Sequence, residues 1–172
     1  MADRILHKGL KAKVMSAEAA AALIPNGAVI GMSGFTGAGY PKAVPIALSK
    51  RALDAKLAGK PLKFDVLTGA STGPEQDTMM SFVEASRFRF PYQGDAVTRE
   101  KINSGLIEYQ DMHLSHAGTL VRYGYYGKGK NNLDFAVIEV TKINEDGTCV
   151  PSSSCGANNI YLEHADKIIL EG

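Results

Sequence analysis

The sequence predicts an α/β fold with a mainly parallel β-sheet flanked by helices, and three observations support this prediction. Short apolar runs bounded by turn residues alternate with helix-forming segments along the chain. Glycine-rich segments follow two of these runs, as is typical of loops that lead from a parallel strand into a helix. The 172 residues, 45% of them hydrophobic, suffice for one domain with a substantial core.

The first elements are defined by their end signals. Ser16 is suited to cap a helix that continues through "AEAAAALI", and a Pro-Asn-Gly turn then leads into the apolar run "AVIGM", a buried strand. After the glycine-rich segment, we expect a helix over residues 41–57, because proline is tolerated in a first helical turn. Gly59 ends that helix.

The remaining elements follow the same alternation. The strongest strand signal is "DFAVIEVTKI", followed by the turn "NEDG" and a returning segment. We expect strands or extended segments at residues 62–68, 87–91, 111–116, 134–143, 148–153 and 167–172. We expect helices at residues 75–85, 96–103, 117–126 and 156–165. The final apolar strand has edges that need covering, which suggests a piece of a longer protein.

Composition excludes several classes of function. A net charge of +1 argues against nucleic acid or a membrane surface as partner. No apolar run approaches the about 20 residues of a membrane helix, and the polar N-terminus lacks a signal-peptide core, so we expect a cytoplasmic protein. Cys149 and Cys155 are expected to be reduced, although a disulfide between them stays open.

No metal site is expected. The two cysteines lack metal-binding spacing. His113 and His116 would lie on opposite faces of a strand, without a third ligand.

The segment "SGFTGAGYP" brings three glycines close together directly after the first strand. Its spacing matches the start of a phosphate-binding loop, but Tyr40 and Pro41 stand where that loop needs Lys and Ser or Thr. The dinucleotide-binding glycine pattern is also absent, so neither ATP nor NAD binding is predicted. The segment is either a ligand loop of another kind or a tight turn with close packing.

Several motifs resemble one family. "NGAVIGMSGFTGAGYP" resembles the first signature of the family I coenzyme A transferases, with Ser33 in place of the first glycine of a pair. "LTGASTGP", "INSGLIEYQDMHLS" and "DGTCVPSSSCGANN" look like the acetyl-CoA hydrolase/transferase branch, which includes succinyl-CoA:acetate CoA-transferases. The resemblance extends from about Arg4 to Glu171 and implies a CoA-transferase domain of the NagB/RpiA-like fold.

The resemblance implies a reaction. Coenzyme A moves between acetyl-, propionyl- or succinyl-CoA and a small carboxylate through an enzyme-bound anhydride and a glutamyl-CoA thioester. CoA is then a substrate, and no tightly bound cofactor is expected. The family's glutamate nucleophile lies in a C-terminal domain, so we expect residues 1–172 to be an N-terminal domain without a catalytic residue. That absent domain is its expected partner, and we expect a homo-oligomer.

Two other functions stay open. One is acetyl-CoA hydrolysis, in which water resolves the intermediate. The other is a non-catalytic acyl-CoA-binding or assembly module. A transferase needs an acceptor carboxylate for turnover, a hydrolase releases CoA without one, and a binding module does neither.

The family's chemistry assigns site residues to the loops that follow the strands. Backbone N–H groups there would face developing oxyanions, and the Ser71 hydroxyl would donate to a bound carboxylate. Alternatively, Ser71 or Thr72 caps the following helix. The expected substrate-binding residues are Gly34, Phe35, Gly37, Gly39, Gly69, Ala70, Ser71, Thr72 and Gly94.

Three further segments have weaker signals. The serines at 152–154 either form a polar loop that caps the last helix or touch the site. Glu139 is either a paired core carboxylate or a site residue, and the resemblance does not make it the nucleophile. The segment "YGYYGKGKNN" is expected to be a surface loop rather than a base-stacking platform.

The missing nucleophile gives a prediction for the domain alone. Because no glutamate in the 172 residues matches the nucleophile motif, the isolated domain should form no new acyl-CoA from acetyl-CoA and succinate. Chromatography of the CoA esters measures this directly. Acceptor-dependent turnover by the isolated domain would refute the assignment.

Overall fold

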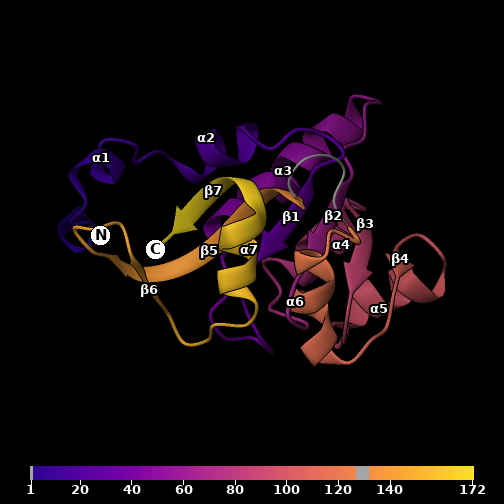
Figure 1. The fold of residues 1–172 in the computed structure, drawn as a ribbon. Helices are drawn as coiled ribbons and strands as arrows, with labels where there is room; N and C mark the ends of the chain where they lie inside the picture. Colours follow the sequence, from indigo (N-terminus) through magenta and orange to yellow (C-terminus); the bar gives the residue numbers. More distant parts are fainter. Residues whose placement is uncertain (1, 127–131) are drawn as a thin grey trace.

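The sheet has parallel strands at its centre and one antiparallel extension (Figure 1). The computed structural model describes residues 2–126 and 132–172, and within these the strand order is β4-β3-β2-β1-β5-β6, with β7 also paired to β5. Only the β5–β6 pair is antiparallel among the paired strands described. The strands are β1 (Val29–Met32), β2 (Phe64–Leu67), β3 (Ser86–Phe90), β4 (Glu108–Tyr109), β5 (Leu133–Ile143), β6 (Cys149–Pro151) and β7 (Ala165–Glu171).

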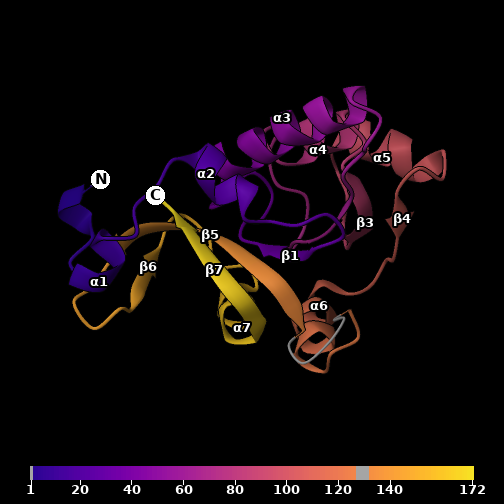
Figure 2. The same ribbon diagram turned by 90° about the horizontal axis from the view of Figure 1, so that it is seen from above.

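Helices cover both faces of this sheet (Figure 2). On one face α2, α3 and α4 pack on apolar side chains that include Ile30, Val66 and Val137. On the other face α6 and α7 pack on a second apolar cluster that includes Leu67 and Ala136. The helices are η1 (Ala2–Arg4), α1 (Lys8–Lys11), α2 (Ala17–Ala22), α3 (Ala43–Leu57), α4 (Asp77–Phe82), α5 (Ala96–Asn103), α6 (Leu114–Arg122) and α7 (Asn158–His164).

The predicted α/β class is therefore confirmed, and so are several local signals. Every residue of β1 and β2 is buried, as expected for continuous apolar runs in a parallel sheet. The Ser16 side chain accepts a hydrogen bond of 3.1 Å from the Ala19 N–H and caps α2. Gly59 adopts φ of 73° just after α3 and ends it as predicted.

The predicted strand at residues 111–116 is wrong. The strand there is only Glu108–Tyr109, and α6 begins at Leu114. Ala117, Gly118 and Val121 form a buried stripe at helical spacing, and the turn that precedes this stripe is helical as well. His113 and His116 consequently do not lie on opposite faces of a strand, since their ring centroids are 5.5 Å apart.

The start of α3 depends on a residue far away in the sequence. The helix begins at Ala43, two residues later than predicted, and its first N–H groups point to the carboxylate of Glu171 at the end of β7. That carboxylate accepts bonds from the N–H groups of Lys42 (2.5 Å), Ala43 (2.8 Å) and Val44 (2.8 Å). It satisfies donors that have no partner within the helix and complements the helix dipole.

Replacing this capping carboxylate should loosen the start of α3. In Glu171→Ala, the amides of residues 42–44 should lose about 1 kcal/mol of protection, a roughly fivefold faster hydrogen exchange. Glu163→Ala is the control, because Glu163 only forms a 3.3 Å ion pair with Arg122 on the surface. Unchanged exchange at residues 42–44 in Glu171→Ala would contradict the capping role.

Candidate functional site

Four segments meet at the carboxyl ends of the parallel strands, where α/β proteins bind ligands. They are residues 33–42 after β1, 68–76 after β2, 91–95 after β3, and 152–157 before α7. The segments approach one another closely at their glycines. A Cβ added to Gly156 would lie 3.2 Å from the carbonyl oxygen of Gly34, and one added to Gly39 would lie 2.5 Å from the Ser154 Oγ.

The four predicted residues of the first loop fall into two pairs. Gly34 has φ of 121°, and its added Cβ would lie 2.5 Å from the Tyr40 Cβ, so Gly34 and Gly39 are required for close packing. Phe35 and Gly37 lie at the exposed tip of the loop, which Phe35 closes by hydrogen bonds with Ala38. Close packing therefore accounts for Gly34 and Gly39, whereas Phe35 and Gly37 are accessible to a ligand.

Tyr40, which stands where a phosphate-binding loop would have Lys, and the nearby Lys42 both make structural contacts. The Tyr40 hydroxyl donates to Glu75 at 2.6 Å, and burial followed by this bond raises the pKa of Tyr40 to about 12. Lys42 donates to the Tyr40 carbonyl (2.7 Å) and to Glu139 (2.6 Å). These contacts fix the end of the loop and pair the Lys42 ammonium with protein oxygens.

Ser71 is held by the loops on both sides of it. Its N–H donates to the Tyr92 carbonyl at 2.9 Å, and its carbonyl accepts from the Thr36 N–H at 2.7 Å. Its Oγ accepts from the N–H groups of Gly94 and Asp95. A hydroxyl has two acceptor lone pairs and one donor hydrogen, so both lone pairs are used.

The donor hydrogen of Ser71 remains available. In the described ranges 2–126 and 132–172, no acceptor receives it, and the side chain is only partly buried. Capping of α4 by Ser71 or Thr72 is wrong, because α4 begins without a side-chain cap. Instead, Asp77 accepts from the Thr72 N–H at 2.6 Å. Ser71 thus offers a ligand one positioned O–H donor.

Two strained residues support Ser71. The non-glycine residues with positive φ in the described part of the chain are Thr36 (44°), Glu84 (59°) and Tyr92 (59°). Such conformations are costly for residues with a side chain and are concentrated at functional sites. Thr36 and Tyr92 are the residues whose main-chain groups bond to the main chain of Ser71.

A buried ion pair holds the loop that carries Ser71. Arg89 and Asp77 are both 0% exposed, and their Nη1 and Oδ1 atoms are 2.7 Å apart. Arg89 also donates to Thr68 at 3.2 Å, and the Thr68 hydroxyl donates to the Ala70 carbonyl at 2.5 Å. Of the predicted residues in this loop, Gly69 and Ala70 are buried, and Ser71 and Thr72 are half-buried. The Thr72 hydroxyl oxygen is itself buried and has no hydrogen-bond partner in the described part of the chain, whereas the Ser71 hydroxyl is held by two N–H donors.

Sequence reasoning missed both members of this ion pair. The pattern "RFRFP" predicts an extended segment, and the arginine between its apolar residues is a further signal, because arginine is rarely buried without a partner. The partner could not be predicted, since Asp77 comes from the next layer of the fold.

Gly94 lies beside the Ser71 hydroxyl. Its φ is not in the left-handed range, and an added Cβ would meet only Ser71, at 3.6 Å from Oγ. Neither backbone nor packing therefore requires glycine here, so the missing side chain leaves open space next to Ser71. The following residue, Asp95, caps α5 and accepts from Thr78 and Thr98. Burial alone would raise the pKa of Asp95, but these hydrogen bonds outweigh it and lower the pKa.

The serine-rich segment contacts the first loop. Ser154 donates to the Ala38 carbonyl at 2.8 Å, and Ser152 donates to Glu139. The alternative that these serines cap the last helix is wrong, because α7 has no side-chain cap. Glu139, bound to Lys42 at 2.6 Å and to Ser152, is a paired carboxylate.

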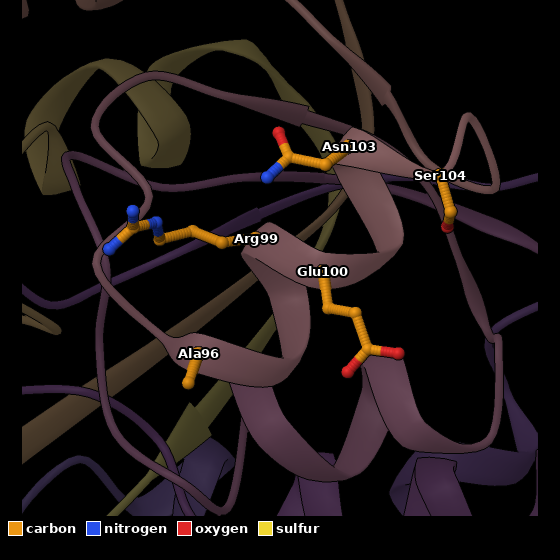
Figure 3. A pocket seen from close by; sticks show the side chains of 5 residues that line it. All are labelled: Ala96, Arg99, Glu100, Asn103 and Ser104. Atoms are coloured by element: carbon orange, nitrogen blue, oxygen red, sulfur yellow. The ribbon is translucent and has the colours of Figure 1, made fainter.

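Two surface depressions are lined by other residues. Figure 3 shows one on α5, and its lining side chains are all exposed and include none of the predicted site residues. They are Ala96, Arg99, Glu100, Asn103 and Ser104. Another adjoins Tyr123, Gly124 and Tyr125. The rest of the predicted surface loop, residues 127–131, lies outside the described residues.

Within the described ranges, no three His, Cys, Asp or Glu side chains are grouped so that they could hold a metal ion. None of the described helices is both long and apolar enough to span a bilayer.

Solved structures define the class of the fold. Glutaconate coenzyme A-transferase from Acidaminococcus fermentans superposes with a TM-score of 0.68 at 14% identity, over 92% of this chain and 68% of that chain. An acyl-CoA transferase from Escherichia coli, solved as a thioester complex with CoA, gives a TM-score of 0.58 at 12% identity, over 74% and 34% of the two chains. The fold is that of CoA-transferases.

Sequence comparison identifies the family. The model of the acetyl-CoA hydrolase/transferase N-terminal domain matches residues 3–171, so the chain belongs to this family. Succinyl-CoA:acetate CoA-transferase of Clostridium kluyveri is 39% identical over 98% of this chain and 30% of its own length. Acetyl-CoA hydrolase of Candida glabrata is 40% identical over 98% and 32%. The chain spans about a third of the length of these relatives.

Breaking the buried ion pair should destabilise the protein strongly. Asp77→Leu leaves Arg89 buried and unpaired, which should cost about 3–5 kcal/mol, whereas the double variant Asp77→Leu, Arg89→Met removes both charges and should recover much of that loss. Thermal unfolding of the single and double variants measures this. A double variant as unstable as the sum of the singles would show that the pair does not act as a unit.

Proposed function

We propose that this domain contributes the carboxylate-binding wall of an acyl-CoA:carboxylate CoA-transferase. The observation that supports this proposal best is the Ser71 hydroxyl, whose two lone pairs are occupied and whose hydrogen is free. A carboxylate is an acceptor-only group when ionised, so it matches such a donor. The family and the names of several relatives agree with this chemistry.

The loop tip adds a second type of donor. In the described part of the chain the Gly37 N–H has no partner, and Gly37 is exposed near Phe35. Thr36 joins this tip to Ser71 at 2.7 Å, so the Gly37 N–H and the Ser71 O–H belong to one connected surface. Such preorganised donors stabilise an oxyanion that develops on a thioester or anhydride carbonyl.

The proposed reaction divides one transfer into two covalent halves. A glutamate outside this domain attacks the thioester carbonyl, which forms an acyl-glutamyl anhydride and releases the CoA thiolate. The thiolate attacks the glutamyl carbonyl, forms glutamyl-CoA and releases the first carboxylate. The acceptor carboxylate then runs the same steps in reverse. This domain binds and orients the carboxylates in both halves.

Acetyl-CoA hydrolysis is the second candidate. It is favoured by a relative named as an acetyl-CoA hydrolase that is 40% identical, about as similar as the transferase relatives. The experiment is a CoA-ester assay on the full-length protein with acetyl-CoA or succinyl-CoA, with and without acetate and succinate. A new acyl-CoA that forms only with acceptor supports transfer, and CoA release without acceptor supports hydrolysis.

Removing the Ser71 hydroxyl should weaken carboxylate binding. In the full-length protein, Ser71→Ala should raise the acceptor KM or lower kcat, with a total loss of about 1–3 kcal/mol, because a hydrogen bond to a charged group is lost. Ser71→Thr should retain part of the activity. Steady-state kinetics with varied acceptor checks both.

Ser104→Ala is the matched control, because the Ser104 hydroxyl donates to the Lys101 carbonyl (3.1 Å) on the exposed end of α5. Equal kinetics of Ser71→Ala and Ser104→Ala would refute the carboxylate contact.

A further inference from the structure

We propose that Tyr92 is a specificity-determining residue whose ring contacts the hydrocarbon chain of the acyl group or carboxylate held at Ser71. This inference rests on the proposed function and deepens it, because it assigns a residue that makes the site selective for the length of the ligand's hydrocarbon chain. It is supported by the backbone of Tyr92, the exposure of its ring, and its connection to Ser71.

The backbone of Tyr92 is in an unfavourable conformation. Its φ is 59°, in the left-handed region where a bulky side chain is a genuine outlier and where Gly, Asn or Asp would be tolerated at less cost. Tyrosine at this position needs a compensating benefit. Residues held in such conformations are typical of ligand contacts when the surrounding structure fixes them.

The core does not supply that benefit. The side chain of Tyr92 is 68% exposed, so burial of the ring offsets little of the strain. Other aromatic residues do stack, with the Phe90 and Tyr126 ring centroids 4.7 Å apart. In residues 2–126 and 132–172, no aromatic ring pairs with Tyr92 and no group bonds to its hydroxyl.

The main chain of Tyr92 is fixed at both polar groups. Its N–H donates to the Tyr109 hydroxyl at 2.9 Å, and its carbonyl accepts from the Ser71 N–H at 2.9 Å. The exposed ring is therefore attached to a backbone that is held by two hydrogen bonds, one of them to Ser71, the residue with the free hydroxyl. Positioning by rigid neighbours is what a selective contact requires.

The space beside Ser71 can admit a carbon chain. Gly94, two residues after Tyr92, leaves the side of the Ser71 Oγ open without being required by backbone or packing. Under this proposal, the chain of a carboxylate bound to the Ser71 hydroxyl extends into this space and contacts the Tyr92 ring. An aromatic ring packs favourably against hydrocarbon. Longer ligand chains bury more apolar surface against the ring and therefore bind more tightly.

The test measures chain-length preference in the full-length protein. Acetate, propionate and butyrate are compared as acceptors for wild type, Tyr92→Gly and Tyr92→Phe. Tyr92→Gly should lower kcat/KM by roughly threefold more for each added methylene group. Tyr92→Phe keeps the ring and should retain the wild-type preference.

Glu84→Gly is the matched control. Glu84 has the same φ of 59°, but its carboxylate pairs with Lys56 at 2.9 Å, away from Ser71. Both variants place glycine at a position with left-handed backbone conformation and so relieve backbone strain. Both should therefore keep the wild-type Tm or exceed it. Only Tyr92→Gly should change the chain-length preference.

Each result decides between the two claims. An unchanged preference in Tyr92→Gly, or an equal change in Glu84→Gly, overturns the role of Tyr92 while leaving CoA transfer intact. If the wild type hydrolyses acyl-CoA without using acceptors, CoA transfer is refuted. The same variants are then compared with acetyl-, propionyl- and butyryl-CoA, where loss of preference in Tyr92→Gly supports the ring contact. A protein without either activity would overturn both claims.

Discussion

The candidate site depends on the hydrogen bonds that fix Ser71 between two neighbouring loops. Its N–H and carbonyl are bound to Tyr92 and Thr36, and its Oγ accepts two further N–H groups. These bonds orient the hydroxyl so that its hydrogen is the group left for a ligand. They also join the loops after β1, β2 and β3 into one surface at the end of the sheet.

Support for this surface comes from the layer beneath it. The fully buried pair of Arg89 and Asp77 connects β3 to α4 and binds both ends of the Ser71 loop. Lys42, Glu139 and Ser152 similarly anchor the first loop to β5 and to the segment before α7. Buried and partly buried charge pairs thus hold the loops of the proposed site in place, while the groups proposed to face the ligand are neutral donors.

Local sequence signals predicted the fold and the loops, whereas long-range contacts were not predictable. The apolar runs, the Ser16 cap and Gly59 mark their elements by short-range chemistry, and the glycine loop was found for the same reason. The Glu171 cap and the Asp77–Arg89 pair join residues that lie far apart in sequence or in different layers. The start of helix α6 differs from the prediction, because its first turn lies in residues 111–116, whereas its buried residues begin at Ala117.

The proposed function requires that the Ser71 hydroxyl donates to a bound carboxylate. A crystal structure of the full-length protein with propionate tests it most directly. We expect a propionate oxygen about 2.5–3.0 Å from the Ser71 Oγ, with the Gly94 and Asp95 N–H groups still donating to the Ser71 Oγ. Propionate bound elsewhere, or Ser71 donating to a protein group in its presence, would contradict it.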